Sequence, residues 1–205
     1  MNHLATFKNA WESDQFIQIE LEPVNINEVL TTRYDCSPQS HMTKSQLWDM
    51  EVRKANRPDL YIPSVIKPGS AKAWGKTTNG HVDTFMRVSE QKLWLEENEY
   101  TTVIENVHVD HKNQMVTFIG EIQATSEFDG EYTTKGKQPI FHVQHGVVGE
   151  ESLPKNTWRI VHLSNDREAE INQRFREKNN YPWLPEYIEI YLRNIVELKL
   201  KRQTK

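Results

Sequence analysis

The first regular pattern along the chain is an alternation of apolar and polar side chains at residues 16–22. The apolar ones are separated by single polar residues and are Ile17, Ile19 and Leu21. Successive side chains of a strand point to opposite faces, so this period of two predicts an early, half-buried strand. Residues 23–42 break the pattern with prolines and asparagines. We interpret them as a connection with at most a short extended piece at residues 29–34.

A helical pattern follows this connection. Thr43 and Gln46 have the spacing of a capping box, in which the hydroxyl and the amide bind backbone N–H groups at the start of a helix. The charged residues that follow fall largely to one side of the apolar ones. The apolar positions are Leu47, Trp48, Met50, Val52 and Ala55. Pro58 disfavours helix at the residue before it and suits a new first turn, so we predict helices ending near Asn56 and covering residues 58–61.

Six strand-like runs occupy the middle of the chain, at residues 70–76, 81–89, 100–109, 113–124, 138–148 and 157–163. Turn signals separate them in pairs. Asn79-Gly80 is a strong hairpin dipeptide, residues 110–113 form a turn-rich link, and residues 149–156 lead from the fifth run into the sixth. We therefore predict three antiparallel hairpins, with residues 126–137 as a polar loop.

Two helices are predicted at the C-terminal end. Ser164 or Asn165 can cap the first, which runs to about residue 179 and is ended by Pro182. The second begins near Pro185, and its apolar residues recur at alternating spacings of four and three, which places them in one stripe. The stripe consists of Leu184, Ile188, Tyr191, Ile195 and Leu198. We expect this helix to dock through that face.

Together these elements predict an α+β fold, in which one curved antiparallel sheet wraps around a C-terminal helix and two short helices follow the first strand. A chain of 205 residues is of ordinary size for one domain. We therefore assign residues 1–205 to a single domain with an irregular lead-in at residues 1–14. The final helix is the first candidate for the helix inside the sheet, and residues 166–178 are the alternative.

Charge and composition exclude several classes of partner. The net charge of −4 provides no positive field for nucleic acid or for an anionic membrane surface. No apolar run approaches the ~18 residues of a membrane span. Cys36 is the only cysteine, so an intramolecular disulfide is excluded. The first residues lack the apolar stretch of a secretory signal, so we expect a cytoplasmic protein. We expect it to be a monomer or a homodimer.

Four short motifs lie in and after the predicted helices. They read Leu47-Trp48, Val52-Arg53-Lys54-Ala55, Arg57-Pro58-Asp59-Leu60-Tyr61-Ile62-Pro63 and Phe85-Met86-Arg87. These motifs resemble those of the START-like helix-grip superfamily, also called SRPBCC, and within it the AtaL-like group. The chain differs from that group in its long N-terminal lead-in and in two C-terminal helices where one long helix is usual.

The resemblance implies a deep apolar cavity between sheet and helix. Members of the superfamily use such a cavity to bind lipids, polyketides and other hydrophobic small molecules, and some transform them without a cofactor. AtaL-like proteins often look like accessory factors of secondary metabolism. By resemblance we expect a hydrophobic small molecule as the partner and no cofactor.

Strand parity places three ionisable side chains on apolar strand faces. Glu105 lies among valines, His145 shares a face with Phe141 and Val143, and His162 follows Trp158 in the same way. In an apolar wall such groups have shifted proton affinities and can act as general acids or bases. For each one, the ordinary alternative is a buried polar group that a neighbour satisfies.

Five residues are candidates for ligand binding. They are the arginine of the family motif, three inner-face residues and a tyrosine of the helical stripe, namely Arg87, Phe141, Val143, Trp158 and Tyr191. Arg87 is as well suited to anchoring structure as to holding a ligand carboxylate.

A metal site is not predicted. His81 with Asp83, and His108 with Asp110, have the spacing that brings two ligands to one strand face, but both pairs lie beside predicted turns. His142 and His145 point to opposite faces. Phosphate-binding loops and nucleophile elbows are missing from the sequence too.

The sequence therefore predicts a binding protein for a hydrophobic small molecule. Cyclase, isomerase or dehydratase activity by acid–base catalysis is one form of this prediction, and non-enzymatic carriage is the other. An NTF2-like cone-fold enzyme is a further alternative, because it also packs helices on a curved sheet. Helices wholly N-terminal to the sheet would favour the cone fold, and a C-terminal amphipathic helix favours the helix-grip fold.

Overall fold

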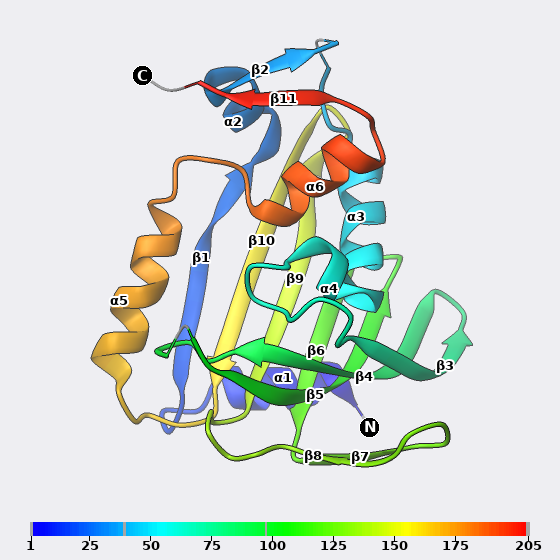
Figure 1. The fold of residues 1–205 in the computed structure, drawn as a ribbon, viewed down its shortest axis with the longest axis vertical. Helices are drawn as coiled ribbons and strands as arrows, with labels where there is room; N and C mark the ends of the chain where they lie inside the picture. Colours follow the sequence, from blue (N-terminus) through cyan, green and yellow to red (C-terminus); the bar gives the residue numbers. More distant parts are fainter. Residues whose placement is uncertain (1, 39, 97, 204–205) are drawn as a thin grey trace.

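The computed structural model describes residues 2–38, 40–96 and 98–203. Within them the main feature is a seven-stranded antiparallel sheet with the strand order β1-β10-β9-β6-β5-β4-β3 (Figure 1). Its strands are β1 (Ile17–Asn25), β3 (Lys72–Asn79), β4 (Val82–Lys92), β5 (Tyr100–Asp110), β6 (Met115–Glu121), β9 (Phe141–Glu150) and β10 (Leu153–His162). Two small sheets pair β2 (Tyr34–Ser37) with β11 (Lys199–Arg202), and β7 (Gln123–Ser126) with β8 (Gly130–Thr133).

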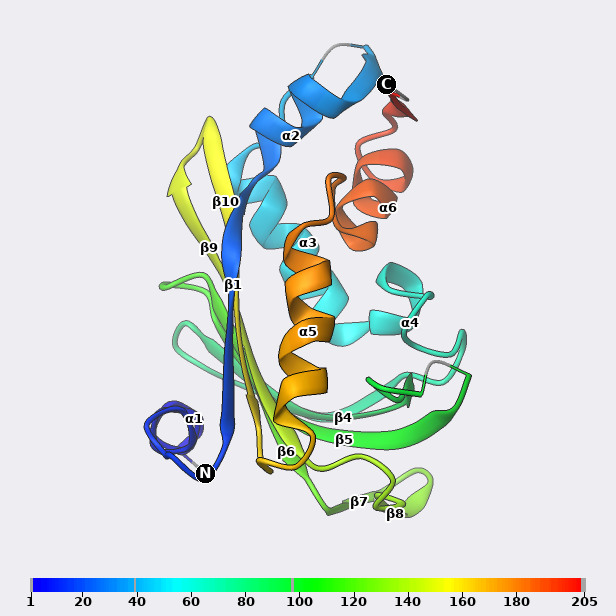
Figure 2. The same ribbon diagram turned by 90° about the vertical axis from the view of Figure 1, so that its left-hand side faces the viewer.

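Helices cover both faces of the main sheet. They are α1 (His3–Trp11), α2 (Ile26–Arg33), α3 (Lys44–Asn56), α4 (Pro58–Tyr61), α5 (Glu168–Asn179) and α6 (Glu186–Asn194). Figure 2 shows α3, α5 and α6 on the concave side of the curved sheet and α1 behind it. Among the described helices, none has both the length and the apolar content that crossing a bilayer requires.

The predicted α+β fold is confirmed: an antiparallel sheet curves around C-terminal helices. The capping box is present, since the Gln46 backbone N–H donates to the Thr43 hydroxyl at 3.1 Å and the Thr43 N–H donates to the Gln46 side chain at 2.9 Å. As predicted, α3 ends at Asn56 and α4 covers the next turn. The hairpin at Asn79-Gly80 also forms, with Gly80 at a φ of 61° that glycine adopts without strain.

Three local predictions are wrong. The predicted irregular lead-in contains α1 at residues 3–11, which Asn2 caps, and Phe7 and Ala10 are buried against Ile119 and Val161 on the outer face of the sheet. The segment 29–34 is not extended, since α2 runs through Arg33. The polar loop contains β8, which pairs with β7, so the run at 113–124 is divided between two strands.

The two C-terminal helices have different positions. Helix α5 lies directly on the sheet, where Ile171 and Phe175 pack with Ile17, Ile19 and Ile160. Helix α6 packs instead with α2, α3 and α4. On the concave side, α5 thus lies over β1, and α6 packs on α3 (Figure 2).

The apolar stripe of the last helix is shorter than predicted. Leu184, Ile188 and Tyr191 are buried, but α6 ends at Asn194 and Ile195 is 43% exposed. Leu198 is buried outside the helix, just before β11. The spacing of four and three therefore continues in the sequence beyond the point where the helix stops.

These positions give a paired test of packing. Ile188→Ala removes a side chain with 0% exposure and should lower the free energy of unfolding by about 2–5 kcal/mol. Ile195→Ala, the matched control seven residues later, should change it by less than about 0.5 kcal/mol. Urea unfolding of both variants measures the difference. Equal losses would contradict the end of α6 at Asn194.

Candidate functional site

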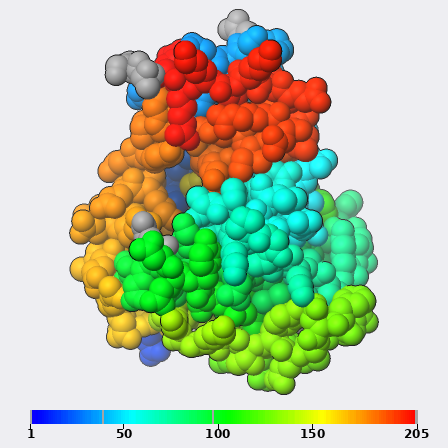
Figure 3. Space-filling view, in the orientation of Figure 1, coloured from blue at the N-terminus to red at the C-terminus, as the bar shows by residue number. Residues whose placement is uncertain are grey.

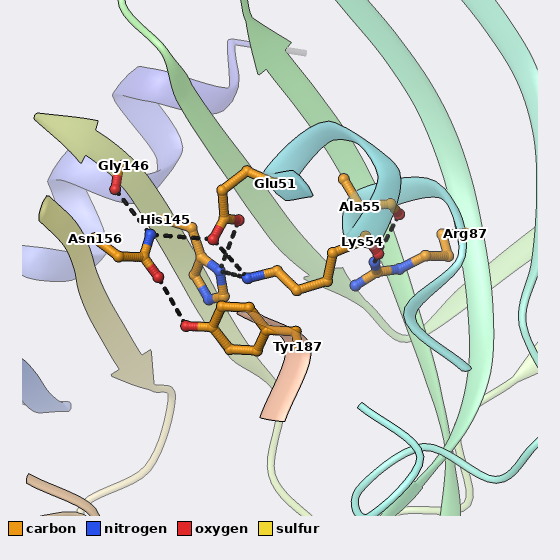
Figure 4. Close-up of polar contacts among 8 residues, drawn as sticks. All are labelled: Glu51, Lys54, Ala55, Arg87, His145, Gly146, Asn156 and Tyr187. Carbon is orange, nitrogen blue, oxygen red and sulfur yellow. Dashed lines mark hydrogen bonds and ion pairs between the residues drawn. The ribbon is translucent and has the colours of Figure 1, made fainter. Parts of the chain in front are cut away.

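A cluster of polar side chains lies between α3 and the concave face of the sheet (Figure 4). Glu51 and Lys54 come from α3, His145 from β9, Asn156 from β10 and Tyr187 from α6. All except His145 are almost completely buried, and the His145 side chain keeps 19% of its exposure. The cluster thus joins two helices to two neighbouring strands.

The period of α3 turns two charged residues toward the sheet. Its buried side chains are spaced by three, four, seven and eight residues from the first, and are Leu47, Met50, Glu51, Lys54 and Ala55. This is the spacing of one helix face. Glu51 and Lys54 were not among the predicted site residues, because the division into apolar and charged positions assigns the charged ones to the opposite side of the helix. The signal was present as an i, i+3 pair of opposite charge within the apolar stripe.

Lys54 is the centre of the cluster. Its Nζ donates to Glu51 Oε1 at 2.8 Å, lies 2.8 Å from His145 Nδ1, and sits 3.8 Å from the centre of the Tyr187 ring. Glu51 Oε2 is 3.3 Å from the same His145 nitrogen. Figure 4 shows the ammonium group enclosed by these three side chains.

Asn156 and Tyr187 complete the hydrogen bonds of the carboxylate. The Tyr187 hydroxyl donates to Asn156 Oδ1 at 2.7 Å, and Asn156 Nδ2 donates to Glu51 Oε1 at 3.1 Å and to the Gly146 carbonyl at 3.0 Å. This arrangement fixes the amide of Asn156 in one orientation. Each polar group of the chain from Tyr187 to Glu51 has a partner, as a buried network requires.

The cluster has a defined charge state at neutral pH. Burial opposes ionisation of Glu51, but Lys54 and His145 outweigh it and hold its pKa down to about 2. Burial lowers the pKa of Lys54, and the Glu51 carboxylate opposes that shift. Burial and the Lys54 charge lower the pKa of His145 from 6.5 to about 4. The cluster is therefore an ion pair next to a neutral imidazole.

The short contact with Lys54 selects the tautomer of His145. An ammonium group can only donate, so Nδ1 accepts and the imidazole proton lies on Nε2. Among the described residues, no hydrogen bond reaches Nε2. His145 thus presents one N–H donor to the inside of the fold.

The arginine of the Phe85-Met86-Arg87 motif forms a second buried ion pair, with Glu105. Arg87 Nε donates to Glu105 Oε2 at 3.0 Å, Nη2 donates to the same oxygen, and Nη1 donates to the Ala55 carbonyl at 2.7 Å. The guanidinium also lies over the Phe118 ring, 4.6 Å from its centre. Arg87 thus ties the end of α3 to β4 and β5, with both charges of the pair neutralised by each other.

The three catalytic candidates are not brought together. His145 is paired with Trp158 across β9 and β10, whereas His162 is paired with Phe141. Four residues of strand separate the two histidines by roughly 14 Å. Glu105 is occupied by Arg87 two strands away from β9. Of the three, only His145 belongs to the central cluster.

The ligand-binding candidates divide in the same way. Val143 and Trp158 are partly buried neighbours of His145 on the inner face, and the Trp158 ring is 5.8 Å from the His145 ring. The buried Trp158 indole nitrogen has no hydrogen-bond partner in the part of the chain that the structure describes. Phe141 packs against Trp94 near His162. The Tyr191 hydroxyl donates to Asp49 at 2.9 Å, in the contact between α3 and α6.

Three of the residues considered for a metal, Asp83, Asp110 and His142, have hydrogen-bond partners. Asp83 accepts from Lys76 at 2.9 Å and lies 3.1 Å from His111, and Asp110 accepts from two backbone N–H groups of the following turn. His142 accepts from the Gly120 N–H at 3.1 Å. Within the described residues there is no group of three or more side chains placed to bind a metal ion.

Comparison with known proteins identifies the fold. No protein-family model matches the chain, and no curated protein matches it. The solved structure of the Zhui aromatase/cyclase from Streptomyces sp. R1128 matches with a TM-score of 0.52 at 9% identity, covering 87% of this chain and 95% of that one. The structure of Ara h 8.0201 matches with a TM-score of 0.49 at 10% identity, covering 86% of this chain and 95% of that one. The structure of major latex-like protein 151 from Panax ginseng matches with a TM-score of 0.48 at 9% identity, covering 88% of this chain and 95% of that one.

The likeness to the aromatase/cyclase concerns the fold alone, because the identity is so low. The chain has the helix-grip fold, which is the fold that the resemblance in the sequence implies. The cone fold is not adopted, since α5 and α6 follow the sheet. Membership of the AtaL-like group stays a prediction from the four sequence motifs.

The pKa shifts predict how acid affects stability. The folded pKa of His145, about 4, lies below its ordinary 6.5, so the native state binds fewer protons and stability falls as pH drops from 6.5 to 4. Glu51 adds a further loss between about pH 4.5 and 2. From pH 7 to 4, wild type should lose roughly 3 kcal/mol more than His145→Gln in urea unfolding.

The difference in pH dependence between wild type and His145→Gln reports on His145 and not on the other buried histidines. Three further histidines have pKa values lowered mainly by burial and remain in both proteins, namely His108, His142 and His162. Their contribution cancels in the difference between wild type and variant. Parallel pH profiles for the two proteins would contradict a low pKa at His145.

Proposed function

We propose that this chain binds a hydrophobic small molecule inside the helix-grip fold, and that His145 donates a hydrogen bond from Nε2 to an acceptor oxygen of that molecule. The observation that carries the proposal is the His145 imidazole itself. It lies on the concave face, keeps 19% exposure, and has Nδ1 fixed by Lys54 while Nε2 is without a partner among the described residues.

The surroundings of His145 favour an apolar ligand. The centre of its ring lies 5.6 Å from that of Phe118 and 5.8 Å from that of Trp158. Val143, on the same strand, is only partly buried. Figure 3 shows a hollow beside α5 in orange, with part of the blue surface of β1 at its bottom. A ligand in such surroundings gains from apolar burial and is oriented by few polar contacts.

The neighbours of His145 suit proton delivery as well as binding. His145 can give its Nε2 proton to a ligand oxygen while Nδ1 takes a proton from Lys54 Nζ at 2.8 Å. The imidazole then stays neutral with its proton on Nδ1, facing Glu51 Oε2 at 3.3 Å. Lys54 becomes a neutral amine, which its lowered pKa favours. The proton gained by the ligand oxygen is thus balanced by the one that Lys54 loses, and Glu51 keeps the Nδ1–H group of His145 as a neighbouring donor.

This relay is common to the reactions expected from the sequence. Cyclisation, isomerisation and dehydration of carbonyl compounds all require a proton on oxygen as the carbon skeleton changes. We therefore extend the proposal to a cofactor-independent cyclase, isomerase or dehydratase of secondary metabolism in the cytoplasm. A carrier of the same fold would use the His145 donor without turnover.

Binding is tested with a solvatochromic naphthyl ketone, whose emission reports both an apolar site and a hydrogen bond to its carbonyl. Saturable binding at one site is expected. His145→Gln keeps a donor at the position of Nε2 and should bind alike, whereas His145→Leu should bind about tenfold more weakly and with blue-shifted emission. His81→Gln, at an exposed turn, is the control. Binding that appears only on unfolding would contradict an internal site.

Catalysis is tested without knowing the substrate. The same ketone in deuterated buffer should exchange its α-hydrogens faster with the protein, because a proton on the carbonyl oxygen promotes enol formation while the α-hydrogen leaves to water. His145→Gln should bind the ketone yet lose roughly 10²–10⁴-fold of this acceleration. Binding without any acceleration in wild type would favour the carrier and exclude the relay.

A further inference from the structure

A separate hollow of about 230 Å³ lies where β10 leads into α5. The β4–β5 connection, the β8–β9 connection and the first turns of α5 enclose it. Its apolar wall contains Trp94, Leu95 and Ile171, and its polar wall contains Gln138 and His162. None of the side chains of the central cluster lines it, and roughly 14 Å of strand separates His162 from His145.

The aromatic wall of this hollow is fixed from both sides. The Trp94 ring is 4.7 Å from Phe141 and 5.3 Å from His162 on the sheet, and 5.1 Å edge-on from Phe175 of α5, measured between ring centres. Its backbone N–H donates to the Gln138 side-chain oxygen at 2.9 Å. A flat apolar surface is therefore held in place at the hollow, as stacking with a ring requires.

His162 offers a hydrogen-bond acceptor to the same hollow. Its Nδ1 is 3.0 Å from the Ser164 carbonyl oxygen, and a carbonyl only accepts, so Nδ1 carries the hydrogen. Burial lowers the pKa of His162, which keeps the ring neutral and leaves the lone pair on Nε2. Among the described residues, none donates to Nε2. The tautomer is thus the reverse of that of His145.

The cations that line the hollow are already paired. Arg167 binds Glu170 at 2.8 Å and lies 3.8 Å from Glu96, and Lys137 pairs with Glu99. The carboxylate of Asp166 adds a negative charge to the lining. Among the described lining residues, no cation is therefore left over for an anionic ligand. A neutral molecule that donates a hydrogen bond fits this balance better than a carboxylate or a phosphate.

We propose that this hollow is a second small-molecule site, for a small neutral aromatic hydroxyl compound whose O–H donates to His162 Nε2 and whose ring packs on Trp94. The volume of about 230 Å³ sets the size. It lies below the roughly 300–1,000 Å³ of sites for drug-sized ligands, so one or two fused rings fit. The site is independent of the His145 donor.

The test compares 1-naphthol with 1-methoxynaphthalene on the full chain. The two probes share their rings, but only the first can donate a hydrogen bond. We expect 1-naphthol to bind about tenfold more tightly, with NMR shift changes centred on Trp94 and His162. His162→Leu should remove the preference, and His162→Gln, which keeps an acceptor oxygen, should retain most of it. His145→Leu should leave the preference for 1-naphthol and the shift changes at Trp94 and His162 unchanged.

Several results would overturn this site. They are equal affinities for the two probes, no binding of either, and shift changes centred on His145 that His145→Leu abolishes. The last would still leave the proposed function standing, because the central site would then be the one occupied. A nitrogen-15 spectrum of the wild-type imidazoles gives an answer independent of the variants, and a protonated Nε2 at His162 would also contradict the proposal.

Discussion

The buried ion pair of Glu51 and Lys54 is the constraint on which the centre of this fold depends. Both side chains are almost fully enclosed, and they hold α3 against β9 through His145 and against β10 through Asn156. Removing one partner of such a pair leaves a buried charge and typically costs about 3–5 kcal/mol, while apolar replacements of both are often neutral. Stability alone therefore does not require these two residues. Their contact with His145 gives the pair a chemical effect, because it fixes both the charge and the tautomer of the imidazole.

The interior contains several ionisable groups and yet remains suited to an apolar ligand. Glu51 is balanced by Lys54, and Glu105 by Arg87, so each charge is neutralised within a hydrogen bond. The two inner-face histidines add donors and acceptors without adding charge. Their roles differ because their neighbours differ: the ammonium of Lys54 makes His145 a donor at Nε2, and the Ser164 carbonyl makes His162 an acceptor there. The inner face of the sheet thus carries a hydrogen-bond donor at His145 and an acceptor at His162.

Most of the fold could be predicted from local patterns. Alternation predicted β1, turn signals between strand-like runs predicted the hairpins, and the capping box at Thr43 predicted the start of α3. The end of α6 could not be predicted this way, because the apolar spacing continues through Ile195 while the chain turns to pair β11 with β2. Helix α1 was missed for the opposite reason. Its short apolar face, Phe7 and Ala10, is buried only because the outer face of the sheet exposes Ile119 and Val161 beneath it.

The candidate site was less predictable than the fold because its residues are assembled from segments far apart in the chain. Strand parity found His145, since its apolar neighbours lie two and four residues before it. Glu51 and Lys54 follow the helical period of α3, but an apolar-versus-charged division assigns such residues to solvent. Only the pairing of opposite charges at i, i+3 within a buried stripe distinguishes them from surface charges. The proton source of the proposed relay is thus encoded in α3, and its position beside His145 arises only when α3 packs on the sheet.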